Sequence, residues 1–331
     1  MVNMNKLQKH KVKDRESWLH LRTSMLHRGM IGGSDAATIL NKNPWKSKTK
    51  LFYEAVGLSI KGTPQNEAMF HGTHLEDYVA DKWQYFDGTE DGLINNYNEK
   101  KKIKRAIKQN AILVNPDFSH MFANVDRIIT KHPERKGRGV LEVKTISDRY
   151  SDMWEAGIPP QYYFQMQHYL LVTGLKWGEF VWLKGGNKLN ILSVDEDIEV
   201  QELIAVESRK FYNSVQQARA SIFELTDPTY NESLSIASQF EPEVDGTDDL
   251  SEYMNERHRN RPTDNQIVGG PVQTDDAIQY KRYKGLESKV SERKTYYANK
   301  IKSFMDSNSA NEMVLENGKV TWKKNFIVNI K

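Results

Sequence analysis

The sequence predicts an α/β protein in which a central mixed sheet is flanked by helices, with a C-terminal extension made of a helix and a hairpin. Two short apolar runs, 121–130 and 139–146, enclose a segment rich in proline, glycine and charge, which indicates a pair of strands joined by a loop. Apolar residues at helical spacing in 66–86 and a proline pair at 159–160 predict two helices beside them. Both kinds of element carry apolar residues, so we expect them to share one core.

The first structured segment is predicted around three glycines, Gly29, Gly32 and Gly33, which allow close approach of the backbone. Ser34 follows them and can cap a helix over 35–40, whose N-terminal amides would favour a phosphate group. An ordinary glycine-rich turn with a serine cap explains the same residues, so both interpretations stay open at this point.

The helix over 66–86 carries one apolar stripe, which predicts a buried face. The stripe consists of Leu75, Val79, Trp83 and Phe86. Glu76 sits at the edge of this stripe, where a carboxylate costs free energy unless it is paired or bound to a metal. Glu76 is therefore a candidate third acidic ligand, and the alternative is a solvated glutamate on the helix flank, like Asp77.

The two strands at 121–146 bring acidic residues together. Side chains alternate across a strand, so Glu142 and Lys144 share one face. If the loop is symmetric, Asp126 lies nearly opposite Glu142, at the separation of cross-strand partners, about 5 Å. Two carboxylates this close repel each other unless a cation neutralises them, and hard oxygen ligands suit Mg²⁺ or Mn²⁺.

Lys144, placed beside such a metal, could orient or deprotonate the attacking water and offset the charge that develops on a phosphate. These residues therefore predict metal-dependent hydrolysis of phosphodiesters. The alternative is an exposed hairpin whose Asp126, Glu142 and Lys144 form surface ion pairs, because a D…ExK pattern also occurs by chance in charged chains.

The helix that begins at Pro159 and Pro160 is predicted to run through Val172. Tyr162 and Gln165 lie three residues apart and share one face of it. A polar pair in this position can reach the proposed site, so both residues are candidates for supporting it or for contacting its substrate.

Two strands at 177–183 and 189–194 and a long amphipathic helix at 198–225 are predicted to complete the first domain. We therefore assign residues 1–225 to this domain and residues 226–331 to the C-terminal extension.

The extension is predicted in three parts. Segment 226–271 is polar with few clustered apolar residues, which is typical of loops or a partly flexible linker. Segment 277–305 has helical spacing and is predicted to be a packed arm or a coiled coil. Segment 312–331 contains Asn317 and Gly318 between apolar runs, a strong hairpin signal.

The chain has 331 residues, no cysteine and a net charge of +3. The absence of cysteine excludes disulfides, thiolate metal sites and iron–sulfur clusters. No apolar stretch approaches the roughly 18 residues that a membrane span needs, and residues 1–15 are too polar for a signal peptide. We therefore expect a cytoplasmic protein with no membrane partner.

Because the net charge is small, affinity for DNA is expected to come from local basic patches. The densest patch is 100–108, and the predicted hairpin loop carries Lys131, Arg135, Lys136 and Arg138 near the proposed site. A solvated charged face is the ordinary alternative for each patch.

Five ordered motifs carry a family resemblance. They are Ile31-Gly-Gly-Ser-Asp-Ala-Ala37 followed by Asn43-Pro-Trp45, then Gly72-Thr-His-Leu-Glu76, Asn124-Val-Asp-Arg127, Glu142-Val-Lys-Thr145 and Tyr163-Phe-Gln-Met-Gln-His-Tyr169. In these motifs the chain resembles the YqaJ-type viral recombinases, relatives of bacteriophage lambda exonuclease within the PD-(D/E)xK nucleases. The resemblance covers roughly residues 15–185 and implies a PD-(D/E)xK core of the restriction-endonuclease type.

The resemblance also implies roles for individual residues. The metal ligands would be Glu76, Asp126, Glu142 and the carbonyl of Val143. Lys144 would be the catalytic lysine, and Gln165 would support the site from its helix. An arginine and a serine would bind the 5′-phosphate of the DNA: Ser34 matches the serine, and Arg22 is favoured over Arg28 because it fits the family's spacing from Trp18.

The activity that the resemblance implies is a Mg²⁺-dependent 5′→3′ exonuclease, with Mn²⁺ as a substitute. It would act on the ends of double-stranded DNA and leave 3′ overhangs for homologous recombination, in a phage or prophage within a bacterial host. The resemblance further implies a ring-shaped homotrimer and a partner protein that anneals single strands.

Two other classes stay open. A PD-(D/E)xK endonuclease, or a nuclease specific for single strands or branched structures, would use the same metal ligands. A non-catalytic DNA-binding accessory module of recombination would require a broken site, whereas all the core ligands are present in this sequence.

Overall fold

The computed structural model describes residues 6–59, 66–259, 268, 270–307, 312–315, 318–322 and 326–330. The chain forms two compact units, Met1–Arg261 and Pro262–Lys331. All the residues predicted to form the site lie in the first unit.

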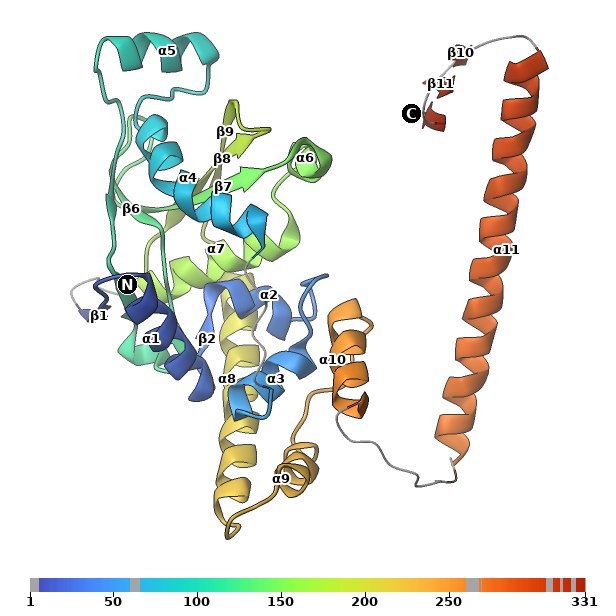
Figure 1. Ribbon diagram of the computed structural model, residues 1–331. Helices are drawn as coiled ribbons and strands as arrows, with labels where there is room; N and C mark the ends of the chain where they lie inside the picture. Colours follow the sequence, from blue (N-terminus) through green and yellow to red (C-terminus); the bar gives the residue numbers. More distant parts are fainter. Residues whose placement is uncertain are drawn as a thin grey trace. The chain divides into compact units, whose positions relative to one another are not determined.

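A five-stranded sheet forms the centre of the first unit (Figure 1). In spatial order its strands are β3 (Arg105–Lys108), β6 (Arg127–Lys131), β7 (Gly139–Ile146), β8 (Trp177–Lys184) and β9 (Lys188–Asp195). β7 and β8 run parallel, whereas the other neighbours are antiparallel. The predicted central mixed sheet is confirmed, and the strands expected after the second helix are β8 and β9.

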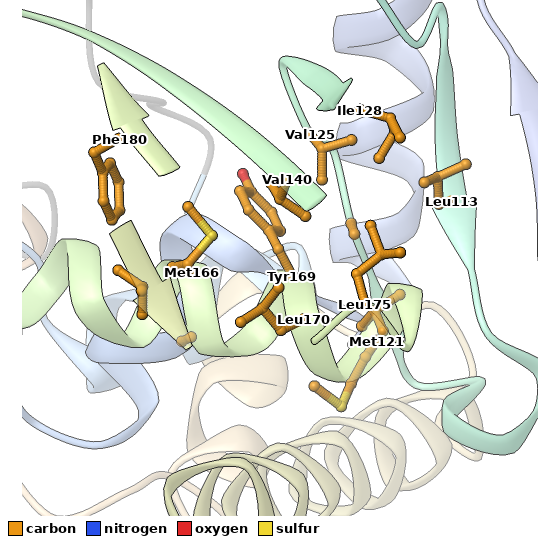
Figure 2. Packing of buried hydrophobic residues seen from close by; sticks show 14 of the residues in the cluster. Leu113, Met121, Val125, Ile128, Val140, Met166, Tyr169, Leu170, Leu175 and Phe180 are labelled. Atoms are coloured by element: carbon orange, nitrogen blue, oxygen red, sulfur yellow. The ribbon is translucent and has the colours of Figure 1, made fainter. Parts of the chain in front are cut away.

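The parallel pair follows from the connection between β7 and β8, which contains α6 (Ser151–Glu155) and α7 (Pro160–Thr173). Parallel neighbours need a crossover of this kind, because a tight turn can only reverse the chain. α7 covers one face of the sheet, where Met166, Leu170 and Val140 belong to one buried cluster (Figure 2).

The opposite face of the sheet is covered by α4 (Glu67–Trp83) (Figure 1). Val79 and Trp83 of this helix share a buried cluster with Leu141 and Val143 of β7. Since alternate residues of β7 face opposite sides, Glu142 and Lys144 project on the side of α7.

Short elements precede and interrupt the sheet. They are β1 (Gln8–Lys11), α1 (Arg15–His27), β2 (Ile31–Gly32), α2 (Ala36–Ile39), α3 (Lys48–Val56), α5 (Glu90–Asn98), β4 (Ala111–Val114) and β5 (Met121–Phe122). β1 pairs with β4, and β2 pairs in parallel with β5.

The prediction of one continuous strand over 121–130 was wrong. β5 pairs with β2 instead of joining the central sheet, and the chain enters the sheet only at β6. Gly32 makes the pairing with β2 possible, because a Cβ there would lie 2.7 Å from the ring of Phe122. Asp126 therefore stands at the entrance to β6, at the end of the irregular segment between the two strands.

The predicted serine cap was also wrong. α2 has only four residues and is preceded by a 3₁₀ turn, Gly33–Asp35. Ser34 lies inside this turn, and no side chain caps either helix. The turn packs closely on α7, since a Cβ at Gly33 would come within 2.3 Å of the ring of Tyr169.

Three helices complete the first unit: α8 (Ile198–Phe223), which was predicted, and α9 (Tyr230–Ala237) and α10 (Asp248–Arg259), which were not. The prediction of loops over this part of 226–271 was wrong, because Leu234 and Leu250 are buried in one cluster with residues of α3 and α8.

The sequences of α9 and α10 are rich in polar residues, so apolar periodicity did not predict these helices. Thr229 and Glu232 form a capping box at the start of α9. The side chain of Asp245 accepts a hydrogen bond from the hydroxyl of Ser47 (2.7 Å), and that of Asp249 forms an ion pair with Lys50 (2.6 Å). The first compact unit consequently extends to Arg261, beyond the boundary expected after residue 225.

The second unit consists of α11 (Pro271–Ser307) and a sheet of β10 (Glu312–Leu315), β11 (Gly318–Trp322) and β12 (Phe326–Ile330). The predicted helix and hairpin are confirmed, since α11 spans the expected helix and β10 and β11 pair antiparallel. Asn317 of the expected turn lies outside the described residues. Among the helices of the described residues, none has the length and apolar character to cross a membrane.

Candidate active site

Asp126 and Glu142 meet where β6 joins β7. The register pairs Arg127 with Leu141, which places the preceding Asp126 beside Glu142. The carboxylate of Asp126 accepts a hydrogen bond from the backbone N–H of Val143 (2.8 Å). The two carboxylates that the sequence predicted to converge therefore do so, although Asp126 reaches across from an irregular segment and not from a strand.

Electrostatics make this pair costly to ionise. Burial raises the pKa of Asp126 well above its usual value, and the negative charges of Glu142 and Glu76 raise it further. Burial likewise raises the pKa of Glu142, against the opposing effect of Lys144. Two buried carboxylates with raised pKa values form a site that a cation would stabilise.

Lys144 lies on the same face of β7 as Glu142. Its amine donates to the carboxylate of Glu142 (2.7 Å) and to the side-chain oxygen of Gln165 (3.5 Å), and it sits 5.0 Å from the ring centroid of Tyr162. Burial alone lowers the pKa of Lys144, but Glu142 and Asp126 outweigh burial and raise it. Lys144 is consequently a charged donor at neutral pH in this arrangement.

Gln165 links α7 to the carboxylates. Its amide nitrogen donates to Glu142 (2.8 Å) and to the hydroxyl of Tyr169 (2.9 Å), one helical turn further on. Lys144 and Gln165 both bond to the same oxygen of Glu142, Oε1, and the other oxygen, Oε2, is buried without a hydrogen-bond partner.

Glu76 is paired with basic side chains. Its carboxylate forms an ion pair with Arg127 (2.7 Å) and lies 3.7 Å from the amine of Lys108. Within the described residues, no group of three or more acidic or histidine side chains is arranged to hold a metal ion. Glu76 nevertheless lies near Asp126, because the guanidinium of Arg127 donates both to its carboxylate (2.7 Å) and to the backbone carbonyl of Asp126 (2.7 Å).

The donor set fits Mg²⁺ or Mn²⁺. The free Oε2 of Glu142 is a buried acceptor that lacks a partner, and Asp126 supplies a second hard oxygen ligand. The N–H and C=O of one strand residue point to the same side, so the carbonyl of Val143 faces the side on which its N–H meets Asp126.

Arg22, and not Arg28, is the arginine beside Ser34. Arg22 donates to the hydroxyl of Ser34 (3.3 Å), lies 3.8 Å from the carboxylate of Asp35 and stacks over Trp18 at 5.9 Å. Arg28 ends α1, where its side chain is exposed. Of the two candidates, the structure brings only Arg22 together with Ser34.

Trp18 joins this arginine to the carboxylates, since its indole N–H donates to the side chain of Asn124 (2.7 Å), two residues before Asp126. Neither this contact nor the roles of Tyr169 and Arg127 were predicted. The four-residue spacing between Gln165 and Tyr169 on a helix was the sequence signal for one of them.

The predicted placement of the hairpin loop near the site was wrong. Lys136 and Arg138 precede β7, whereas Glu142 and Lys144 lie further along it, about 13 Å from Arg138 to Glu142 at the usual rise of a strand. The carbonyl of Lys136 accepts from the indole of Trp177, at the start of β8. This loop therefore lies at the end of the strand pair opposite to the carboxylates.

Three of the six cations in the basic segment 100–108 form ion pairs within the fold. Lys102 pairs with a carboxylate of α4, Lys104 with a buried glutamate of β8, and Lys108 with Asp77 at 2.8 Å. Lys100, Lys101 and Arg105 are exposed, so for these three both a basic patch and the solvated charged face that the sequence left open stay possible.

Comparison with known proteins gives the following matches. The family model of the YqaJ-like viral recombinase domain matches residues 17–176. The uncharacterized protein YqaJ of Bacillus subtilis (strain 168) is 28% identical over 302 residues, which cover 90% of this chain and 81% of that protein.

Two solved structures are similar in part. An alkaline exonuclease (LHK-Exo) from Laribacter hongkongensis is 19% identical with a TM-score of 0.48, covering 63% of this chain and 96% of that chain. A phage related exonuclease from Haemophilus somnus 129PT is 12% identical with a TM-score of 0.34, covering 56% and 95%.

Proposed function

Because this chain belongs, through residues 17–176, to the family of YqaJ-like viral recombinase domains, we propose that it is a metal-dependent exonuclease that degrades double-stranded DNA from the 5′ end. The 3′ overhang that remains would serve homologous recombination. The observation that carries the proposal is the buried pair Asp126 and Glu142, with a free carboxylate oxygen and Lys144 beside it.

The chemistry of the residues follows from their contacts. Mg²⁺ would be held by Asp126, Glu142 and the carbonyl of Val143. Glu76 would become a further ligand if its carboxylate left the ion pair with Arg127 and bound the metal instead. The bound ion would lower the pKa of a water and offset charge on the phosphate. Gln165 and Lys144 both donate to the carboxylate of Glu142 and fix its position. The charged Lys144 would also donate hydrogen bonds that orient the attacking water and the phosphate oxygens.

Polarity is tested with linear duplex DNA labelled at the 5′ or the 3′ end, with closed circular duplex as the control. We expect Mg²⁺-dependent release of the 5′ label first, while the circular DNA stays intact. Cleavage of the circle would establish the endonuclease alternative, early release of the 3′ label would reverse the polarity, and absence of any cleavage would favour the accessory module.

We further propose that Arg22 and Ser34 bind the terminal 5′-phosphate, since a guanidinium and a hydroxyl already meet there. Duplex with a 5′-phosphate is expected to be degraded about 10-fold faster than duplex with a 5′-hydroxyl, the size of one hydrogen bond to a charged group. Arg22→Ala should erase this preference and leave slow hydrolysis, because the carboxylates are untouched.

Arg28→Ala is the matched control and should keep the preference, because the side chain of Arg28 is exposed at the end of α1. Initial rates on the two substrates give the measurement. Equal rates of the wild-type protein on both substrates would show that there is no site for the 5′-phosphate. Loss of the preference only in Arg28→Ala would assign the phosphate site to Arg28 instead of Arg22.

A homotrimeric assembly and a single-strand annealing partner belong to the same proposal. The family resemblance supports them, and the mass of the protein in solution by light scattering tests the first. A mass of about one chain, or of two, would exclude the trimer.

A further inference from the structure

A groove between α1 and α4 reaches Asp126 of the candidate site. Its volume is about 470 Å³, and its lining includes Glu76 and Asp126. Its lining also includes Lys13 and Arg15, from the segment before α1 and the start of that helix, and Thr73 of α4. The groove is therefore continuous with the place where a phosphodiester would be cut.

Arg15 is fixed across this groove without an acidic partner. Its guanidinium donates to the hydroxyl of Thr73 (3.3 Å) and lies 6.0 Å from the ring centroid of Trp18. Thr73 in turn donates to the carbonyl of Met69, so its hydroxyl is oriented to accept from Arg15. No carboxylate of the described residues forms an ion pair with Arg15.

Two other cations around the site are compensated, whereas Lys13 has no ion pair within the described residues. Arg127 pairs with Glu76 and Asp77, and Lys108 pairs with Asp77. Asp14, beside Arg15, uses its carboxylate to cap α1 by accepting from the N–H of Ser17 (2.8 Å). Arg15 is therefore an exposed positive charge in the groove. Because no carboxylate of the described residues pairs with it, its guanidinium is available to bind an anion.

α1 sets the spacing between the two arginines. Arg15, Trp18 and Arg22 lie three and four residues apart, on one face of the helix. The seven residues from Arg15 to Arg22 rise about 10 Å along the helix axis. Between them, Trp18 contacts Asn124, two residues before Asp126, so the segment that carries Asp126 lies opposite the middle of this span.

Three consecutive phosphates of a DNA strand fit such a span. Each nucleotide advances about 3.4 Å along the axis of B-DNA, so three phosphates cover about 7 Å along the axis and more along the winding backbone. With the terminal phosphate at Arg22 and the first internucleotide phosphate at the carboxylates, the second internucleotide phosphate falls on the side of Arg15.

We propose that Arg15, oriented by Thr73, binds the phosphate of the second internucleotide linkage, one nucleotide beyond the bond that is cut. This inference rests on the proposed function and deepens it, because it names the part of the substrate that the groove holds. The strand is then held on both sides of the reacting phosphate, which fixes that phosphate at the carboxylates.

The test uses 5′-phosphorylated duplexes in which one linkage of the degraded strand is an uncharged methylphosphonate. The modification stands at the second linkage or, as the control, at the fifth. Release of the first nucleotide is measured for the wild-type protein, Arg15→Ala, Arg15→Lys and Thr73→Val. Arg209→Ala removes an exposed arginine of α8 outside the groove and is the matched control.

For the wild-type protein, neutralising the second linkage is expected to lower the rate about 10-fold, while neutralising the fifth changes little. Arg15→Ala should be about 10-fold slower on unmodified DNA and insensitive to the modification, because the interacting partner is already gone. Arg15→Lys should recover part of the rate, Thr73→Val should lose part of it, and Arg209→Ala should behave like the wild-type protein.

Equal sensitivity of the wild-type protein and Arg15→Ala to the second linkage would overturn the inference while leaving the proposed function intact. If the wild-type protein hydrolyses no DNA, the proposed function fails instead. In that case the affinity for the same duplexes, measured by fluorescence anisotropy without a divalent metal, decides the inference. It is supported if neutralising the second linkage weakens binding by the wild-type protein but not by Arg15→Ala. It is overturned if both proteins lose the same affinity.

Discussion

Replacing Asp126 or Glu142 by alanine is expected to abolish hydrolysis of DNA. Each change removes one of the two oxygen ligands that meet between β6 and β7, and Glu142→Ala also removes the acceptor of Lys144 and Gln165. A metal ion contributes several kcal/mol of transition-state stabilisation, so the rate should fall about 10³-fold or more. The measurement is the single-turnover rate on linear duplex DNA with saturating Mg²⁺.

Two controls separate lost chemistry from lost folding. Glu202→Ala removes an exposed carboxylate of α8 and should keep the full rate. Asp126→Ala and Glu142→Ala should retain the wild-type far-UV circular dichroism and DNA affinity, since both relieve the mutual repulsion that raises the pKa of Asp126. Substantial hydrolysis by either variant would move the reaction to other residues.

Lys144→Ala is expected to slow hydrolysis about 10²-fold or more while DNA binding persists, the effect of removing one oriented donor from a developing charge. The amine is held by Glu142 and Gln165, and its raised pKa keeps it protonated. Its role is therefore that of a charged donor whose loss lowers kcat more than it raises KM.

Lys144→Met keeps most of the side-chain volume and tests whether charge or packing matters. It should be as slow as Lys144→Ala, whereas Lys188→Ala, at the exposed start of β9, should match the wild-type protein. A wild-type rate for Lys144→Met would show that the ammonium group has no part in the reaction.

The local part of the candidate site could be predicted from the sequence, because it depends on two short-range periodicities. Alternation along β7 put Glu142 and Lys144 on one face, and the return of the chain brought Asp126 beside them. Helical spacing aimed Gln165 from α7 at the same point. These relations hold within a few residues or across one strand pair.

Contacts between distant segments could not be predicted in the same way. Nothing in the sequence around Glu76 specifies that its carboxylate forms an ion pair with Arg127, 51 residues later. The basic run 100–108 could not reveal that Lys104 pairs with the buried Glu179 of β8. Partners of charged side chains depend on which elements become neighbours, which composition and periodicity leave open.

Helices and strands with a strong apolar periodicity could be predicted from the sequence. Helices whose segments are rich in polar capping residues were missed. β8, β9, α7 and α8 carry continuous apolar patterns, whereas α9 and α10 are short and bury only a few side chains, among them Leu234 and Leu250. The break between β5 and β6 was missed because Phe122 and Ile128 are both apolar, although they serve different sheets.

The most direct test of the account is the dependence of hydrolysis on a divalent metal. Linear 5′-phosphorylated duplex is incubated with the protein in EDTA, then with Mg²⁺, Mn²⁺ or Ca²⁺ in excess. The pair of buried carboxylates predicts no cleavage in EDTA, full cleavage with Mg²⁺ or Mn²⁺, and inhibition by Ca²⁺, whose looser coordination does not organise the attack. Full activity in the chelator would contradict a metal site at Asp126 and Glu142.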